Sequence, residues 1–439
     1  MKAGKETLVV VVGAGASIKA GISSTEELTT LAKRVLPTIA VPGVPYTLTV
    51  ESSVKPAERH FFQNNRYPSL SDILDQGLRA DYGEHYDFER ILHALEELET
   101  FVDARYNPEG WQSPATPVLG SFAELMRRFD CLSDETVLRT ARFDVLKAIH
   151  RRVGCDCEDL AKAHSAQNAR EQLTRIFESL AQHYRLVVID FNYDDLLDRM
   201  EKLGWHDGFS QYVPDKFCYL FDPADWASHV EDGETHLLMH LHGSVRYGYR
   251  PSTTLRDATT RFAEPAWYER TDGAQESVAG RTVSGTTVDG DSADAAFIVS
   301  GYRKAGKMAY NARPYGYYYG TIMNVVPRAR RLLMLGYGWR DTHVNTWLNE
   351  YVACQPERRT AVVTKRLGSQ TLEHPESVGN ARLAGPAWGA FRSVGYARNP
   401  GDLQTASPFK AVDGFALAPE GFIMAQEDES ALLSFFIDE

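Results

Sequence analysis

The stretch that most constrains how this chain can fold is residues 186–198, which read LVVIDFNYDDLLD. Its apolar run ends in an acid, the polar turn FNYD follows at residues 191–194, and residues 196–200 begin a helical spacing. A buried strand that stops abruptly at polar residues is typical of a parallel α/β sheet, whose carboxyl edge binds ligands. The stretch therefore predicts a strand that presents Asn192 and Asp194 at such an edge.

A second strand, at residues 7–12, ends in the small residues GAGAS. Small residues allow the backbone to approach a pyrophosphate, and the amides ahead of a helix attract its charge. We expect Gly15 at a point where a Cβ would crowd that approach. A plain tight turn accounts for the same residues, and the run by itself leaves both interpretations open. The candidate phosphate-binding residues are Gly13, Ala14, Gly15, Ala16 and Ser17.

A third strand, at residues 236–241, leads into His242, Gly243 and Ser244. Side chains alternate along a strand, so His240 and His242 point to the same face. We expect the deeper His240 to satisfy a neighbouring carbonyl group. His242, at the carboxyl end of the strand, is the histidine that we expect to reach a ligand.

A fourth strand, at residues 332–335, ends at Gly336 and Tyr337, and Asp341 and Asn345 follow where a helix is expected to begin. Glycine at a strand end followed by polar residues suits the binding of a ribose hydroxyl. An ordinary turn with an N-cap at Asp341 accounts for the same pattern.

These strand ends and the helical patterns between them predict an α/β fold, a Rossmann-like parallel sheet with a helical insertion domain. We expect the core at residues 1–44 and 185–365, the insertion at residues 45–184, and a C-terminal extension of unassigned fold at residues 366–439. The clearest helical spacings lie at residues 87–102, 122–129, 137–152 and 171–184.

Three shorter stretches carry local predictions. Ser24 and Glu27 form a capping-box pattern, which predicts the start of a helix. Residues 271–294 are poor in large apolar side chains and predict a surface loop. Residues 302–319 are rich in Tyr, Arg, Lys and Gly, which suits either closure over a ligand or a surface for a partner.

Composition excludes several classes of function. The formal net charge of −12 argues against direct binding of nucleic acid. No apolar stretch is long enough to span a bilayer or to form a signal peptide, so we expect a cytoplasmic protein without membrane contact. Of the five cysteines, only Cys155 and Cys157 are close in sequence, and a four-cysteine zinc module needs two such pairs. We therefore expect reduced thiols and no bound metal.

Over roughly residues 7–365 the chain resembles the sirtuin-like family, and especially its prokaryotic antiphage-defence branch. The motifs that carry the resemblance are GAGAS, DFERIL at residues 87–92, NYD at 192–194, HGS at 242–244 and GYG at 336–338. The chain departs from protein-deacylating sirtuins in lacking their zinc module. It also carries Ser23-Ser24-Thr25 where those enzymes have Pro-Asp-Phe-Arg after the glycine loop.

The resemblance implies that NAD is a substrate, hydrolysed to ADP-ribose and nicotinamide. It implies that Asn192 orients the ribose or a water and that Asp194 binds the carboxamide. It also implies that His242 is the general base, because imidazole titrates near the working pH. The other implied NAD-binding residues are those of the GAGAS run, then Gly243, Ser244, Gly336 and Tyr337, and, on the adenosine side, Asp341 and Asn345.

Alternative functions remain open at this point. One is a protein deacylase or ADP-ribosyltransferase, against which the missing zinc module counts. Another is a non-catalytic nucleotide-binding sensor, against which Asn192 and His242 count. Under the hypothesis that the protein hydrolyses NAD, the resemblance implies an activating partner, such as a HerA-like ATPase or a short Argonaute, or assembly into a homo-oligomer.

Overall fold

The computed structural model of the chain supplies both its backbone and its side chains. The residues that the structure describes are 5–36, 70–83, 86–106, 135–159, 164–249, 265–279, 297–299, 304, 312–337, 341, 344, 347–348, 359–363, 410–412, 415–418 and 426–437.

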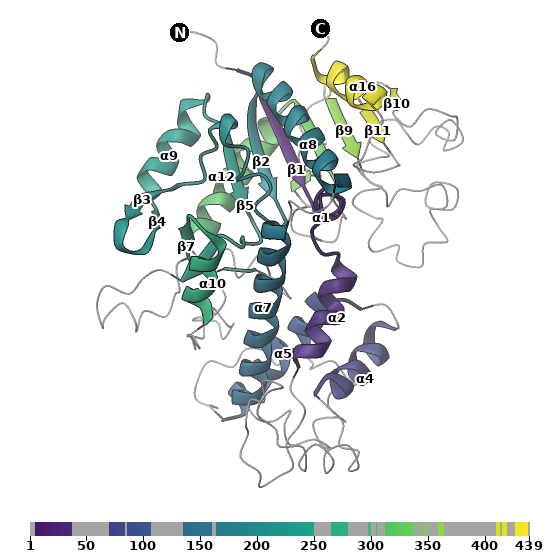
Figure 1. Cartoon of the computed structure of the whole chain (residues 1–439), viewed down its shortest axis with the longest axis vertical. Coiled ribbons are helices and arrows are strands. Elements are labelled where there is room, and N and C mark those ends of the chain that lie inside the picture. Colours follow the sequence, from purple (N-terminus) through teal and green to yellow (C-terminus); the bar gives the residue numbers. More distant parts are fainter. Residues whose placement is uncertain are drawn as a thin grey trace.

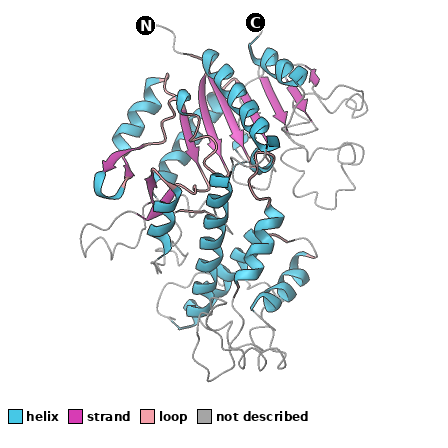
Figure 2. Cartoon of the chain, viewed as in Figure 1, coloured by secondary structure: helices cyan, strands magenta, loops and turns pink. Residues whose placement is uncertain are grey.

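The centre of the fold is a seven-stranded sheet with the order β10-β11-β9-β8-β1-β2-β5 (Figures 1 and 2). All neighbouring strands are parallel except β10 and β11, which pair antiparallel. The predicted α/β fold with a Rossmann-like parallel sheet is therefore confirmed. The strands are β1 (Thr7–Val12), β2 (Arg185–Asp190), β5 (Leu237–His240), β8 (Arg331–Leu335), β9 (Arg359–Val363), β10 (Lys410–Val412) and β11 (Phe415–Ala418).

The central strand β1 is buried on both faces, as its unbroken apolar run predicts. Val9 and Val11 belong to one hydrophobic cluster, together with apolar side chains of helix α12 (Tyr317–Val325). Leu8, Val10 and Val12 belong to a second cluster, on the face covered by α8 (His164–His183) and α16 (Gln426–Ile437). This two-sided burial fixes the strand in the middle of the sheet, so its carboxyl end opens between layers of helices.

The described residues between β1 and β2 are helical. Helix α2 begins with the predicted capping box, in which Ser24 accepts from the Glu27 amide and Glu27 accepts from the Ser24 amide. Figure 1 shows α2, α4, α5 and the lower part of α7 grouped beyond the carboxyl ends of the strands, while α8 runs back along the sheet. Besides α8, the helices of this region are α1 (Ala14–Ile18), α2 (Thr25–Val35), α4 (Leu70–Tyr82), α5 (Phe88–Tyr106) and α7 (Glu135–Glu158).

A smaller antiparallel sheet, with the order β3-β4-β7-β6, lies beside the main one. Its strands are β3 (Phe209–Val213), β4 (Cys218–Phe221), β6 (Tyr247–Tyr249) and β7 (Pro265–Tyr268). The helices of this part of the chain are α9 (Pro223–Asp232), α10 (Thr271–Ala279), the π-helix η6 (Ala312–Gly316), and the 3-10 helices η3 (Glu201–Leu203), η4 (Pro214–Lys216) and η7 (Val326–Arg328).

The C-terminal residues, whose fold the sequence does not assign, join the main sheet. Strands β10 and β11 extend its edge beyond β9. Helix α16 packs on α8, where the Glu429 carboxylate accepts hydrogen bonds from Gln172 at 3.1 Å and from both Arg175 Nε and Arg175 Nη2 at 3.1 Å. The chain end therefore completes a layer that covers the sheet.

Two local predictions are wrong. Residues 196–199 form turns instead of the start of a helix. Of the loop expected at residues 271–294, residues 271–279 form helix α10, and residues 280–294 lie outside the described residues. In the stretch 302–319, for which closure over a ligand or a partner surface was expected, Tyr315 and Tyr318 are fully buried, whereas residues 302–303 and 305–311 lie outside the described residues, so that expectation stays a prediction. Among the described helices, none is long and apolar enough to cross a membrane.

Candidate active site

A cavity of about 480 Å³ lies at the carboxyl ends of β1, β2, β5 and β8. Its walls come from the loops after these strands and from the starts of α2 and α5. The side chains expected at separate strand ends therefore meet in one place. The predicted site residues that line this cavity are Gly13, Ala14, Gly15, Ser17, Asn192, Asp194, His242, Gly336, Tyr337 and Asp341.

Asn192 is fixed in this cavity by hydrogen bonds on two sides. Its Nδ2 donates to Ser17 Oγ at 2.8 Å, and its backbone amide donates to Asp190 Oδ1 at 3.0 Å. The side chain is buried, and no described residue hydrogen-bonds Asn192 Oδ1. A buried polar atom is normally paired, so this oxygen is an acceptor that suits a ligand hydroxyl or a water.

Asp194 lies two residues further on and is also buried. Burial raises the pKa of its carboxyl to about 7, the Asp190 carboxylate adds to the rise, and the Ser17 hydroxyl opposes it. Among the described residues none hydrogen-bonds Asp194 Oδ2. Near neutral pH this carboxyl can therefore exist in either form, as a donor or an acceptor toward an amide group.

His242 stands against an aromatic wall at the side of the cavity. Its ring meets Phe191 edge-on, with centroids 4.9 Å apart, and Phe191 in turn stacks on Tyr337 at 5.2 Å. His242 Nε2 lies 3.5 Å from Asp341 Oδ1. A carboxylate at that position suits the orientation of an imidazole that acts as a general base.

Asp341 takes part in a series of ion pairs that the sequence does not predict. Lys304 Nζ lies 2.9 Å from Asp341 Oδ1 and 2.8 Å from Glu89 Oε1. Burial lowers the pKa of Lys304, but the two carboxylates outweigh it, so the pKa lies above its usual value and the ammonium stays charged. Glu89 belongs to the DFERIL motif, whereas nothing in the sequence singles out Lys304.

The glycines of the site also contact one another. A Cβ on Gly13 would lie 2.7 Å from Tyr337 Cα, and a Cβ on Gly15 would lie 2.8 Å from Gly336 Cα. The amides of Gly13 and Gly15 donate to the carbonyl oxygens of Leu335 and Gly336 at 2.9 and 3.0 Å. These two amides therefore hold the loop after β8 in place, and the small residues are needed there whether or not a pyrophosphate binds.

Below the cavity, His240 bridges two buried carboxylates. Its Nδ1 lies 3.3 Å from Asp190 Oδ2 and its Nε2 lies 3.0 Å from Asp198 Oδ2. Burial lowers the pKa of His240, but Asp198 and Asp190 outweigh it and raise the pKa well above its usual value. The expectation that His240 satisfies a carbonyl group is wrong. It neutralises the same aspartate that holds the Asn192 amide.

Ala16, Gly243 and Ser244, which were also predicted, are not among the residues that line the cavity. Ala16 is buried beneath the glycine loop. Gly243 has a φ of +89° and a Cβ there would meet Phe297 O at 2.1 Å, so glycine is needed for the turn that carries His242. The Ser244 hydroxyl is buried and accepts from the Arg246 amide at 3.2 Å. Asn345 lies outside the described residues.

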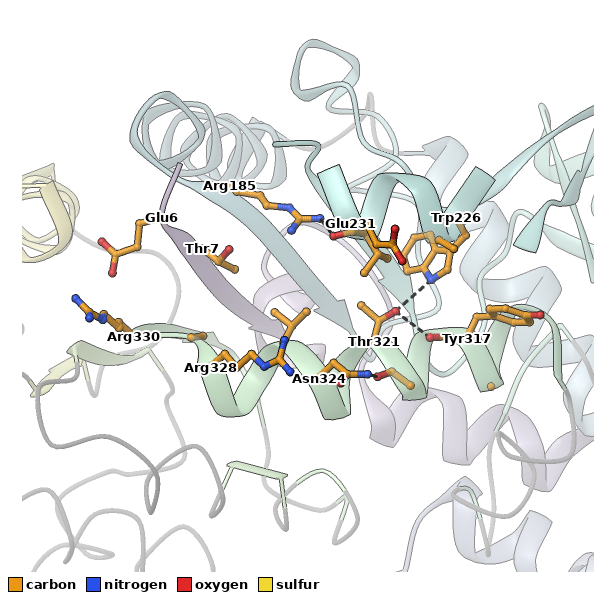
Figure 3. A pocket seen from close by; sticks show the side chains of 16 residues that line it. Glu6, Thr7, Arg185, Trp226, Glu231, Tyr317, Thr321, Asn324, Arg328 and Arg330 are labelled. Carbon is orange, nitrogen blue, oxygen red and sulfur yellow. Dashed lines mark hydrogen bonds between the residues drawn. The ribbon is translucent and has the colours of Figure 1, made fainter. Parts of the chain in front are cut away.

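A second cavity, of about 950 Å³, lies at the amino end of β1 between α9 and α12 (Figure 3). It is larger, but none of the predicted strand-end residues lines it. Arg185 in its wall donates to the carbonyl oxygens of Thr235, His229 and Val230, and Trp226 Nε1 donates to Thr321 Oγ1 at 3.1 Å. These side chains are engaged by other groups of the protein, whereas the predicted site residues line the smaller cavity, which is therefore the candidate active site.

Comparison with known proteins gives one match. A family model described as a SIR2-like domain matches residues 186–377, from β2 to beyond β9. No curated protein matches the chain. The match includes Asn192, Asp194, His242 and Gly336 and leaves out the glycine run after β1. It supports a sirtuin-like family and an NAD-dependent activity in general.

Proposed function

We propose that this protein is an NAD glycohydrolase, which cleaves NAD to ADP-ribose and nicotinamide. The proposal rests on one observation: Asn192 and His242 line the same cavity at the carboxyl edge of the main sheet. Both residues belong to the region that matches the SIR2-like domain. Asn192 has a buried acceptor and His242 has a carboxylate within 3.5 Å. We propose that a substrate hydroxyl or a water binds between them.

The reaction breaks the bond between nicotinamide and the ribose. The nicotinamide nitrogen leaves with the electron pair, and positive charge develops on the ribose ring. A water oxygen then bonds to the ribose carbon, and one proton of that water passes to His242. Asn192 orients the water or a ribose hydroxyl through Oδ1, and Asp194 hydrogen-bonds the carboxamide of the leaving group.

The alternatives differ from this proposal in their products. A protein ADP-ribosyltransferase would release nicotinamide while attaching ADP-ribose to a protein, and a deacylase would consume NAD only with an acylated peptide. A nucleotide-binding sensor would bind NAD and release nothing. Chromatography of the products from NAD, with and without an acetylated peptide, separates these outcomes.

We further propose that the enzyme is an antiphage-defence effector that is silent until activated. Uncontrolled loss of NAD would kill the host cell, so the proposed activity requires control. The start of α5 supports a control point, because Asp87, Phe88 and Glu89 form part of the cavity wall. A HerA-like ATPase, a short Argonaute or a second copy of the chain are the proposed activating partners.

The decisive test measures nicotinamide release from NAD by the activated protein. Asn192→Ala and His242→Ala should each lower the rate by about 100-fold or more, as expected for loss of a positioned group or general base. Asn324→Ala and His183→Ala, at exposed positions on α12 and α8, are the matched controls and should keep the parent rate. A folded Asn192 or His242 variant that works at the parent rate would refute the assignment.

A further inference from the structure

Away from the carboxyl ends of the strands, two histidines and an aspartate come together at the edge of the main sheet. His206 lies in the loop before β3, while Asp225 and His229 are one turn apart on α9. One ligand-type atom from each of the three lies within 4.8 Å of the other two. Of the residues that the structure describes, these form the group with the spacing of a metal site.

We propose that His206, Asp225 and His229 bind one divalent transition-metal ion, with Zn²⁺ as the best fit. Imidazole nitrogen and carboxylate oxygen are common zinc ligands, at bond lengths near 2.1 Å. Two ligands of a tetrahedral ion are then about 3.4 Å apart. His206 Nε2 lies 3.4 Å from Asp225 Oδ2, and His229 Nδ1 lies 3.4 Å from Asp225 Oδ1.

Two of these atoms are buried and lack another partner. His206 Nε2 and Asp225 Oδ2 have no hydrogen-bond partner among the described residues, and their mutual distance of 3.4 Å is long for a hydrogen bond. A bound cation would satisfy both. His229 Nδ1 also lies 2.9 Å from the Asp225 carbonyl oxygen, so metal binding replaces that hydrogen bond.

The ligands are held in place by the surrounding fold. The His206 backbone pairs with the edge strand, accepting from the Leu238 amide at 3.0 Å and donating to His236 O at 2.9 Å. Its ring lies between those of Trp226 and His229, at centroid distances of 5.9 and 3.8 Å. The His206 and His229 rings are stacked with 28° between their planes, so both side chains must rotate for their nitrogens to point at one ion.

Figure 1 shows α9 beside the edge strand β5 and the start of β3. A metal ion bound by His206 and by two residues of α9 would fasten that helix to the sheet edge. The proposed role is structural, and it is independent of the proposed NAD cleavage. This proposal departs from the expectation that the chain binds no metal, which was based on the missing cysteine pairs.

The test uses the full chain, freed of metal with a chelator and titrated with Zn²⁺ by calorimetry. We expect one ion per chain, an increase in the unfolding temperature with Zn²⁺, and no response to Mg²⁺, which prefers oxygen ligands. The double variant His206→Gln/His229→Gln should bind Zn²⁺ at least about tenfold more weakly, the loss that even an outer partner of a metal site can cause. His183→Gln, at an exposed position on α8, is the control and should bind like the parent.

The half-exposed Asp225 gives a second variant in case the double variant does not fold. Asp225→Asn should weaken Zn²⁺ binding while leaving the far-ultraviolet circular dichroism unchanged. Co²⁺ in the parent should give the visible absorption of a four-coordinate ion, and this absorption should be lost in Asp225→Asn. No Zn²⁺ binding by the parent, or equal binding by parent and Asp225→Asn, would overturn the proposal.

Discussion

At the scale of single residues, the position of Asn192 depends on a chain of buried contacts. Its backbone amide donates to Asp190, whose second carboxylate oxygen faces His240, and His240 is shared with Asp198. Burial raises the pKa of the Asp190 carboxyl, and the neighbouring His240 opposes that rise, so His240 favours the charged carboxylate that accepts the Asn192 amide. The core histidine thus contributes to the geometry of the candidate site without touching a ligand.

Asp194 gives a prediction about pH. Its pKa is about 7 in the folded protein against a usual value of 3.8, so the folded state binds more protons than the unfolded state between these values. The free energy of unfolding therefore falls as the pH rises through this window and is level above it. Asp194→Asn cannot ionise, so its stability relative to the parent should grow from pH 4 to pH 8, by at most about 4 kcal/mol.

Urea unfolding at pH 4.5 and pH 8 measures this difference, because these two pH values lie below and above the pKa of about 7. Asp215→Asn, at an exposed position in η4, is the matched control and should show no such growth. A constant difference between Asp194→Asn and the parent at both pH values would mean that the carboxyl is not held in the protonated form.

Much of the candidate site could be predicted from the sequence because each part follows an apolar run. Asn192, Asp194 and His242 come directly after buried strands, and parallel strands bring their carboxyl ends to one edge. Lys304 could not be predicted in this way, because its role depends on Glu89 and Asp341, which are distant in the chain. The partners of His240 were missed for the same reason.

At the scale of elements, the glycine loop and the loop after β8 fit against each other. The sequence predicts that Gly15→Val weakens NAD binding more than folding, whereas the structure predicts a loss of folding stability as well. A Cβ at Gly15 would lie 2.8 Å from Gly336 Cα and 2.9 Å from Gly336 O, and backbone atoms cannot move aside as a flexible side chain can. Gly15→Ala should therefore lower the free energy of unfolding by about 1–3 kcal/mol.

Gly320 on α12 provides the opposite case in the same fold. A Cβ there meets no atom within 4 Å, so Gly320→Ala should raise the free energy of unfolding by about 0.5–1 kcal/mol through helix propensity. Chemical unfolding of both variants, alongside NAD titration, checks the pair. A Gly15→Ala variant as stable as the parent would show that the two loops do not pack tightly.

Strands were easier to predict than turns and helices of mixed composition. The apolar runs of β1, β2, β5 and β8 predict buried strands, and these four strands are neighbours in the sheet, with β5 at its edge. Helix α10 was missed because its sequence, TDGAQESVA, is small and polar, and its few apolar groups, such as Ala274 and Val278, are buried by contacts distant in sequence. Local pattern carries no information about such tertiary burial.

At the scale of the whole molecule, a few side chains connect the helices between β1 and β2 to the candidate active site. Glu89 at the start of α5 pairs with Lys304, Lys304 pairs with Asp341, and Asp341 faces His242. If a partner or a second copy of the chain displaced α5, we expect these ion pairs to change and, through them, the environment of the proposed general base. This connection gives the proposed activation a physical route.

The last prediction concerns this route. Isolated chains should turn over NAD slowly, and turnover should rise by about 5- to 150-fold on forming an oligomer or a complex with the partner, the usual range of coupling between two sites. Glu89→Gln breaks the ion pair between α5 and Lys304, so it should raise the rate of isolated chains and reduce the further gain on assembly. Light scattering after size-exclusion chromatography, run with the NAD assay, relates rate to assembly. Glu26→Gln, exposed on α2, is the control, and full activity of strictly monomeric parent protein would exclude this form of regulation.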